Sequence, residues 1–147
     1  MYAAHLDAQY SMLRGKRILV VEDEALVSML MEEELLDAGA LVIGPACSLD
    51  EALRLTETAA ADGGLSVAVL DINLAGVAVW PVADRLAALG VPFVFSTGYD
   101  DNHNPARHAA APRLVKPFDL DALVAVVQQL TVRGHILETS AASRGTT

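Results

Sequence analysis

Short, continuous apolar runs separated by helical patterns constrain this chain most strongly. None of the runs alternates apolar with polar residues, as a strand with one solvent-facing side would. Continuous runs of this length are typical of strands in a parallel sheet that is covered on both faces. Five such runs occur, at residues 18–21, 41–43 (the weakest), 67–70, 93–95 and 114–115.

Helical patterns lie between these runs. In the first, Leu26, Met29, Leu30 and Leu36 predict one buried stripe, and Gly39 provides a stop. A second helix is predicted from the capping-box spacing of residues 48–51 to about residue 61.

Two further helices are predicted in the second half of the chain. One covers about residues 79–88, where Pro81 is tolerable because it lies in the first turn. The last begins near Asp119, and its predicted buried stripe consists of Leu120, Leu123, Val124, Val127 and Leu130. Between them, residues 99–113 are rich in Asn, Asp and Pro, so we expect a loop or a weak helix there.

Strands alternating with helices predict an α/β fold, a doubly wound five-stranded parallel sheet flanked by helices (flavodoxin-like), whose fourth helix is weak or loop-like. The 147 residues suit one domain. We expect an N-terminal extension at residues 1–15, the domain at residues 16–131, and a flexible C-terminal tail at residues 132–147.

Composition narrows the function. A net charge of −9 without a basic patch argues against nucleic-acid binding. The apolar runs are too short to span a membrane, and the N-terminus does not resemble a signal peptide, so we expect a cytoplasmic protein. The single cysteine, Cys47, excludes an internal disulfide and is expected to be a small buried residue at a strand end.

Polar residues follow four of the predicted strands. The first is followed by Glu22-Asp23-Glu24, the third by Asp71 and Asn73, the fourth by Ser96-Thr97-Gly98 and the fifth by Lys116. In open α/β sheets ligands bind at the carboxyl ends of the strands, so these side chains should meet. Clustered carboxylates are typical of a Mg²⁺ site, and a carboxylate beside Mg²⁺ can attack phosphorus. Lys116 and Thr97 could then stabilise the moving oxygens.

Over about residues 16–130 the sequence resembles the CheY-like receiver domains of two-component response regulators. The matching residues are Glu22, Asp23, Asp71, Thr97 and Lys116. The resemblance implies that Asp71 accepts a phosphoryl group from a sensor histidine kinase or a phosphotransfer protein. It also implies that Asp23, Asp71 and the backbone carbonyl of Asn73 bind Mg²⁺, with Glu22 helping through water. Such a phosphoprotein is a signalling domain rather than an enzyme, with slow autodephosphorylation.

Two departures from that family stand out. Ala75 replaces the usual proline, and Arg113 occupies the position of the usual aromatic switch residue. The segment at residues 95–99 resembles the subgroup called FAT GUY regulators, in which an aromatic residue after the Thr-Gly pair, here Tyr99, takes the switch role. That likeness implies partner kinases of the HWE or a related type.

Two other functions compete with this interpretation. One is a receiver-fold docking module that no longer takes a phosphoryl group. The other is a haloacid-dehalogenase-like phosphatase, which Asn73 argues against because an amide cannot act as the acid/base that this class places there. About 17 residues follow the last predicted helix. We therefore expect a stand-alone domain, a monomer or weak dimer, whose output is a protein contact or competition for phosphoryl groups as a phosphate sink.

Overall fold

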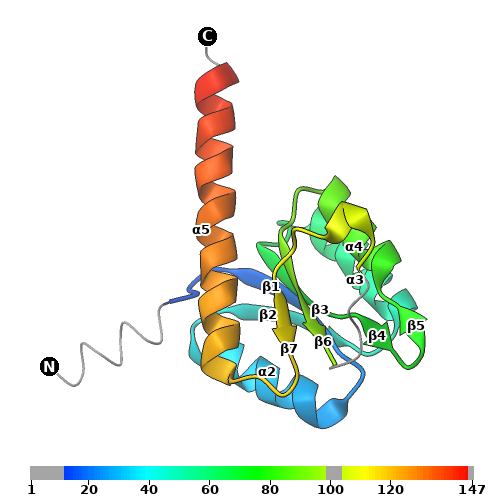
Figure 1. The fold of residues 1–147 in the computed structure, drawn as a ribbon. Helices are drawn as coiled ribbons and strands as arrows, with labels where there is room; N and C mark the ends of the chain where they lie inside the picture. Colours follow the sequence, from blue (N-terminus) through cyan, green and yellow to red (C-terminus); the bar gives the residue numbers. More distant parts are fainter. Residues whose placement is uncertain (1–11, 99–103, 146–147) are drawn as a thin grey trace, which may run out of the picture.

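The computed structural model describes residues 12–98 and 104–145, with only the backbone for residues 133–145. A five-stranded parallel sheet, ordered β2-β1-β3-β6-β7, forms its centre (Figure 1). The strands are β1 (Arg17–Val21), β2 (Leu41–Ala46), β3 (Val67–Asp71), β6 (Phe93–Thr97) and β7 (Arg113–Val115). Each contains one of the predicted apolar runs. A short antiparallel hairpin, β4 (Asn73–Leu74) and β5 (Val77–Ala78), directly follows β3.

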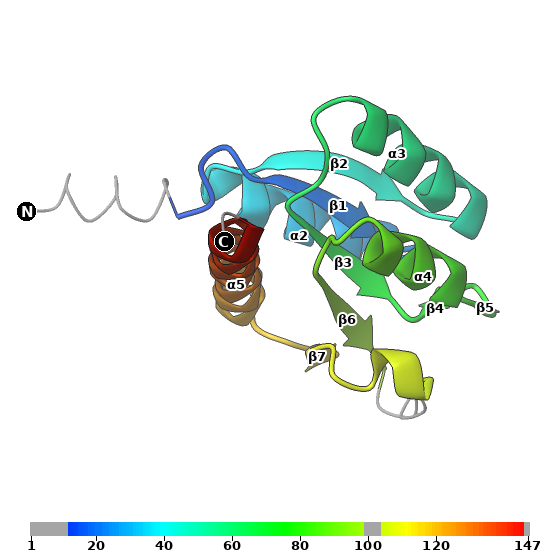
Figure 2. The ribbon, with the colours of Figure 1, turned by 90° about the horizontal axis from the view of Figure 1, so that it is seen from above.

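Helices cover both faces of the sheet, as Figures 1 and 2 show. On one face lie α2 (Ala25–Asp37) and α5 (Leu120–Gly145), and on the other α3 (Leu49–Ala61) and α4 (Trp80–Ala88). A short 3₁₀ helix, η1 (Ala106–His108), occupies the segment where a weak helix is predicted. The doubly wound, flavodoxin-like fold is therefore confirmed, including its reduced fourth helix.

The sheet divides the core into two layers. Leu19, Leu70 and Phe95 face α3 and α4, whereas Val20 and Val69 face α2 and α5. Every residue of β3 is buried. Because both faces of the central strands are covered, these strands read as continuous apolar runs.

Several local signals act as predicted. The Ser48 side chain accepts a hydrogen bond from the Glu51 backbone N–H and caps α3. Pro81 lies in the first turn of α4. In α5, Leu123, Val124 and Val127 are buried against the sheet.

The predicted buried face of α2 is wrong. Leu26, Met29, Leu30 and Leu36 are all exposed, and the helix instead buries Ser28, Met31 and Leu35. The helix carries apolar residues on most of its surface, so periodicity alone does not select a face. Its position after β1 decides which side meets the sheet, and the apolar stripe is left in solvent.

Two further expectations differ from the structure. The final helix, α5, continues to Gly145, past the predicted end near residue 131, because no proline interrupts the segment and an existing helix propagates readily. Cys47 is exposed rather than buried, since β2 is an edge strand that ends at Ala46. Among the described residues, no helix is both long and apolar enough to cross a membrane.

Candidate functional site

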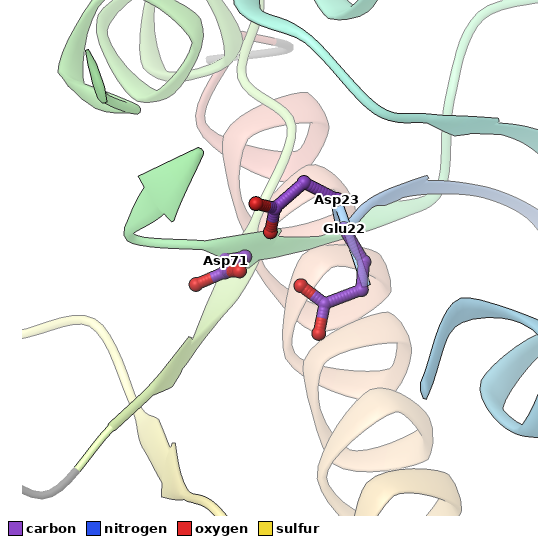
Figure 3. A group of neighbouring side chains, drawn as sticks. All are labelled: Glu22, Asp23 and Asp71. Carbon is purple, nitrogen blue, oxygen red and sulfur yellow. The ribbon is translucent and has the colours of Figure 1, made fainter. Parts of the chain in front are cut away.

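Three carboxylates gather at the carboxyl ends of β1 and β3. Glu22 and Asp23 directly follow β1, and Asp71 is the last residue of β3. The two strands are parallel neighbours with Val21 opposite Leu70, so the residues after these positions meet at one edge. One oxygen of each carboxylate lies within 4.8 Å of one from each of the others (Figure 3). The predicted acidic cluster is therefore present.

Burial makes this cluster electrostatically expensive. Glu22 is 1% exposed and Asp71 5% exposed. Burial, and after it the neighbouring Glu22 carboxyl, raises the pKa of Asp71 from its ordinary 3.8 to about 8. Without a cation Asp71 therefore holds a proton near neutral pH, and a bound cation would favour its charged form.

Lys116 is the positive charge at this edge, at the position that the sequence predicts. Its Nζ lies 2.5 Å from Glu22 Oε1, 3.4 Å from Asp71 Oδ2 and 3.7 Å from Glu24 Oε1. Partial burial works to lower the pKa of Lys116, but its hydrogen bond to Glu22 and the surrounding carboxylates outweigh burial and raise the pKa. The ammonium is thus a fixed charge that neutralises only part of the cluster.

The donor set fits a hard divalent cation. Glu22 Oε2 is buried and has no hydrogen-bond partner among the described residues. The cluster borders an open depression of about 250 Å³, which Asp23, Asp71, Asn73 and Lys116 help to line. Only oxygen ligands are offered, as Mg²⁺ prefers, and the depression leaves room for water in the coordination shell.

The loop after Asp71 is folded back onto the cluster by polar contacts. The Asn73 N–H donates to Asp71 Oδ1 (3.2 Å), and the Ala75 N–H donates to Asp23 Oδ2 (3.0 Å). Ala75 and Gly76 have φ of 51° and 91°, and the Gly76 N–H donates to Asn73 Oδ1 (2.7 Å). Sequence reasoning missed the contribution of Ala75 and Gly76, although Asn followed by Gly three residues later indicates a tight turn.

The hydroxyl side of the site is built by β6. Ser96 is paired with Asp71 across the sheet, which puts Thr97 one residue beyond it at the strand end. Thr97 is 1% exposed, and its hydroxyl donates to the Gly98 carbonyl (3.1 Å). Gly98 lines the same depression as Asp71.

Of the two predicted switch residues, the structure describes only Arg113. Tyr99 lies outside the described residues. Arg113 begins β7 opposite Phe95 of β6 and is partly buried. It therefore begins the strand that Lys116 directly follows.

The chain was compared with family models, with curated proteins and with solved structures. No family model matches the chain. The chain is 33% identical over 128 residues to the transcriptional activator protein IrlR of Burkholderia pseudomallei. The aligned region covers 84% of this chain and 54% of IrlR. The chain thus spans about half the length of the curated relative that it matches.

Solved structures cover most of the domain. SdrG from Sphingomonas melonis is 38% identical, with a TM-score of 0.63, over 78% of this chain and 96% of that one. The response regulator TrrA of Thermotoga maritima, solved with Mg²⁺-BeF, is 28% identical over 78% and 98% of the two chains, with a TM-score of 0.65. TrrA was also solved in complex with the histidine kinase ThkA. Further structural neighbours are described as response regulator receiver domains.

Proposed function

We propose that this chain, a response regulator receiver domain by its fold and its structural neighbours, accepts a phosphoryl group on Asp71. The observation that carries the proposal is the position of the Asp71 carboxylate, 3.4 Å from the Lys116 ammonium and within reach of two further carboxylates, beside an open depression. A nucleophile, a fixed positive charge and room for a phosphoryl group meet there. Receiver-domain neighbours support a role in two-component phosphorelay signal transduction.

The residues at this edge would hold Mg²⁺. Asp23 and Asp71 would bind it directly, with the backbone carbonyl of Asn73, and Glu22 would act through water. When bound, the ion would neutralise the cluster and the charge that develops on the phosphoryl oxygens. Glu22 Oε2, which is buried without a hydrogen-bond partner in the part of the chain that the structure describes, and the all-oxygen donor set support this assignment.

The chain's own residues divide the work of transfer. A carboxylate oxygen of Asp71 forms the new bond to phosphorus as the donor's nitrogen–phosphorus bond breaks, and the departing imidazole is left to take up a proton. Lys116 offers its charge to a phosphoryl oxygen, and Thr97 offers a hydroxyl donor. For Thr97 to do so, its present hydrogen bond to the Gly98 carbonyl must be exchanged.

The donor is proposed to be a sensor histidine kinase, of the HWE or a related type, or a phosphotransfer protein. The α2 stripe of Leu26, Met29 and Leu30 is exposed, and it adjoins a groove of about 520 Å³ lined by Val27, Phe118 and other residues. Glu24 and Lys116 line both this groove and the depression at Asp71. An apolar surface next to the acceptor suits a helical partner that brings its phosphohistidine to Asp71.

The proposed output is a contact with another protein or a phosphate sink, in the cytoplasm, by a monomer or weak dimer. A chain with net charge −9 does not suit phosphate contacts with nucleic acid. Placement in the FAT GUY subgroup, with Tyr99 as its aromatic switch, remains part of this proposal.

Intact mass tests the proposal. The protein is incubated with Mg²⁺ and acetyl phosphate and weighed beside Asp71→Asn, with Asp50→Asn as a matched control on the α3 surface. We expect a gain of one phosphoryl group in wild type and in Asp50→Asn, and none in Asp71→Asn. No gain in wild type with either acetyl phosphate or a phosphorylated histidine kinase would favour a docking module without phosphotransfer.

A further inference from the structure

A buried histidine holds η1, the short helix before β7, against the sheet. His108, the last residue of η1, is 4% exposed. Its ring stacks near Trp80 (centroids 6.3 Å apart, planes at 25°) and meets Phe93 and Phe95 edge-on, at 5.5 and 6.1 Å. The imidazole thus takes the place of a core side chain in a layer of aromatic rings.

A single carboxylate ties this segment to α4. Asp84 Oδ1 lies 2.7 Å from His108 Nε2, and the same carboxylate accepts hydrogen bonds from Arg107 Nε (2.6 Å) and Nη2 (3.1 Å). The Arg107 guanidinium first, and His108 second, lower the pKa of Asp84. Asp84 therefore stays ionised and bridges two consecutive residues of η1.

The aromatic rings connect this contact to the Asp71 site. Trp80 begins α4, and the residue before it, Val79, donates its N–H to the Ile72 carbonyl (2.9 Å), next to Asp71. Phe95 lies edge-on to Trp80 (5.5 Å) and two residues before Thr97, on the same side of β6. The loop after Asp71 and the end of β6 thus both rest on aromatic rings that contact His108.

We propose that Asp84, Arg107 and His108 form a latch that stabilises the resting arrangement of the Asp71 site, with His108 as a positioning residue that acts through Phe95 and Trp80. This inference rests on the proposed phosphoryl acceptance. Packed cores change between discrete arrangements rather than deforming continuously. With His108 held by Asp84, the rings keep the end of β6 in the position where Thr97 donates to Gly98. Opening the latch lowers the cost of moving Thr97 toward a phosphoryl group.

A pair of matched variants tests the latch. Asp84→Ala removes the carboxylate that holds η1. Glu57→Ala removes another exposed carboxylate that is paired bidentately with an arginine, here Arg85 of α4 rather than Arg107 of η1. We expect Asp84→Ala to take a phosphoryl group from acetyl phosphate about fivefold faster than wild type, because its lost contacts with Arg107 and His108 no longer hold the resting arrangement. Glu57→Ala should match wild type.

Fluorescence separates this proposal from the proposed function. Trp80 is the sole tryptophan, so the fluorescence emission of the protein, measured without any phosphodonor, reports on the ring that His108 contacts. Asp84→Ala should change that emission, and Glu57→Ala should leave it unchanged. His108→Phe, which keeps an aromatic ring but cannot bond Asp84, should also take the phosphoryl group faster.

Two results would overturn the latch. One is an Asp84→Ala protein with wild-type emission and, where wild type is phosphorylated, a wild-type rate. The other is an equal change in Asp84→Ala and Glu57→Ala. A wild-type protein that takes no phosphoryl group from acetyl phosphate or from a kinase would instead reject the proposed function, and the emission would still decide whether Asp84 holds His108 against Trp80.

Discussion

The two sides of the Asp71 site are held in different ways. On the acidic side, Glu22 and Lys116 are joined directly by a contact of 2.5 Å, and Lys116 also reaches Asp71. On the hydroxyl side, Thr97 is positioned by its strand, which rests on the rings of Trp80, Phe95 and His108. The acidic side is thus held by direct charge pairs, whereas the hydroxyl side is held by packing, and we expect this packing to change between discrete arrangements.

Removal of Lys116 should have the largest effect, because it breaks the acidic side outright. Lys116→Met leaves the buried Glu22 without its partner, which should cost about 3 kcal/mol in the free energy of unfolding. It should also slow phosphoryl acceptance from acetyl phosphate by about 100-fold. Urea unfolding and intact mass measure the two effects, and Lys16→Met, at a lysine outside the cluster, is the control. An unchanged rate would remove Lys116 from the proposed transfer step.

Truncation of His108 tests the hydroxyl side of the site. His108→Ala leaves a hole among three aromatic rings and should lower the free energy of unfolding by about 3 kcal/mol. Arg107→Ala, in the next position but exposed, should lower it by less than about 1 kcal/mol. Urea unfolding compares the two variants. Equal losses would mean that the Asp84 pair, and not ring packing, holds η1.

The acidic side should make stability depend on pH through Asp71. The pKa of Asp71 is about 8 in the folded protein against 3.8 ordinarily, so the folded state binds the proton more tightly. This group's contribution is therefore largest at low pH, and stability falls as pH rises toward 8. Without metal, the wild type should lose about 2 kcal/mol relative to Asp71→Asn between about pH 5.5 and pH 7.5. Parallel curves for the two proteins would contradict this, and added Mg²⁺ should reduce the loss.

An exposed pair away from both sides should matter least. Glu57→Ala breaks the contact between Glu57 and Arg85, whose side chains are 53% exposed for Glu57 and 42% exposed for Arg85. We expect a change of less than about 0.5 kcal/mol in the free energy of unfolding and no change in phosphoryl acceptance. A loss above about 1 kcal/mol would contradict the expectation that this exposed pair contributes little to stability.

The acidic side could be predicted from the sequence, because its chemistry lies in residue types that follow recognisable strands. Asp71 and Lys116 meet as expected, since parallel strands deliver their ends to one edge. The hydroxyl side could be predicted only in part. A histidine in a loop gives no periodic signal, and only the fold shows that His108 packs between α4 and β6.

The α2 helix shows the same limit in another form. The spacing of its apolar residues predicted a buried stripe at Leu26, Met29 and Leu30, but in a helix with apolar residues on most of its surface spacing alone does not fix the face that meets the sheet. The helix buries Met31 and Leu35 instead. The spacing of apolar residues therefore predicted the helix correctly and assigned the wrong face to the core.

The most direct test of the account is to locate the phosphoryl group within the chain. The protein is treated with Mg²⁺ and acetyl phosphate and reduced with borohydride, which converts an aspartyl phosphate to homoserine. Peptide mass spectrometry then identifies the altered residue. We predict homoserine at Asp71 and unchanged carboxyl groups at Glu22 and Asp23. Modification at either of those two residues would contradict this claim, and so would modification at no residue after treatment with acetyl phosphate and, separately, with a phosphorylated histidine kinase.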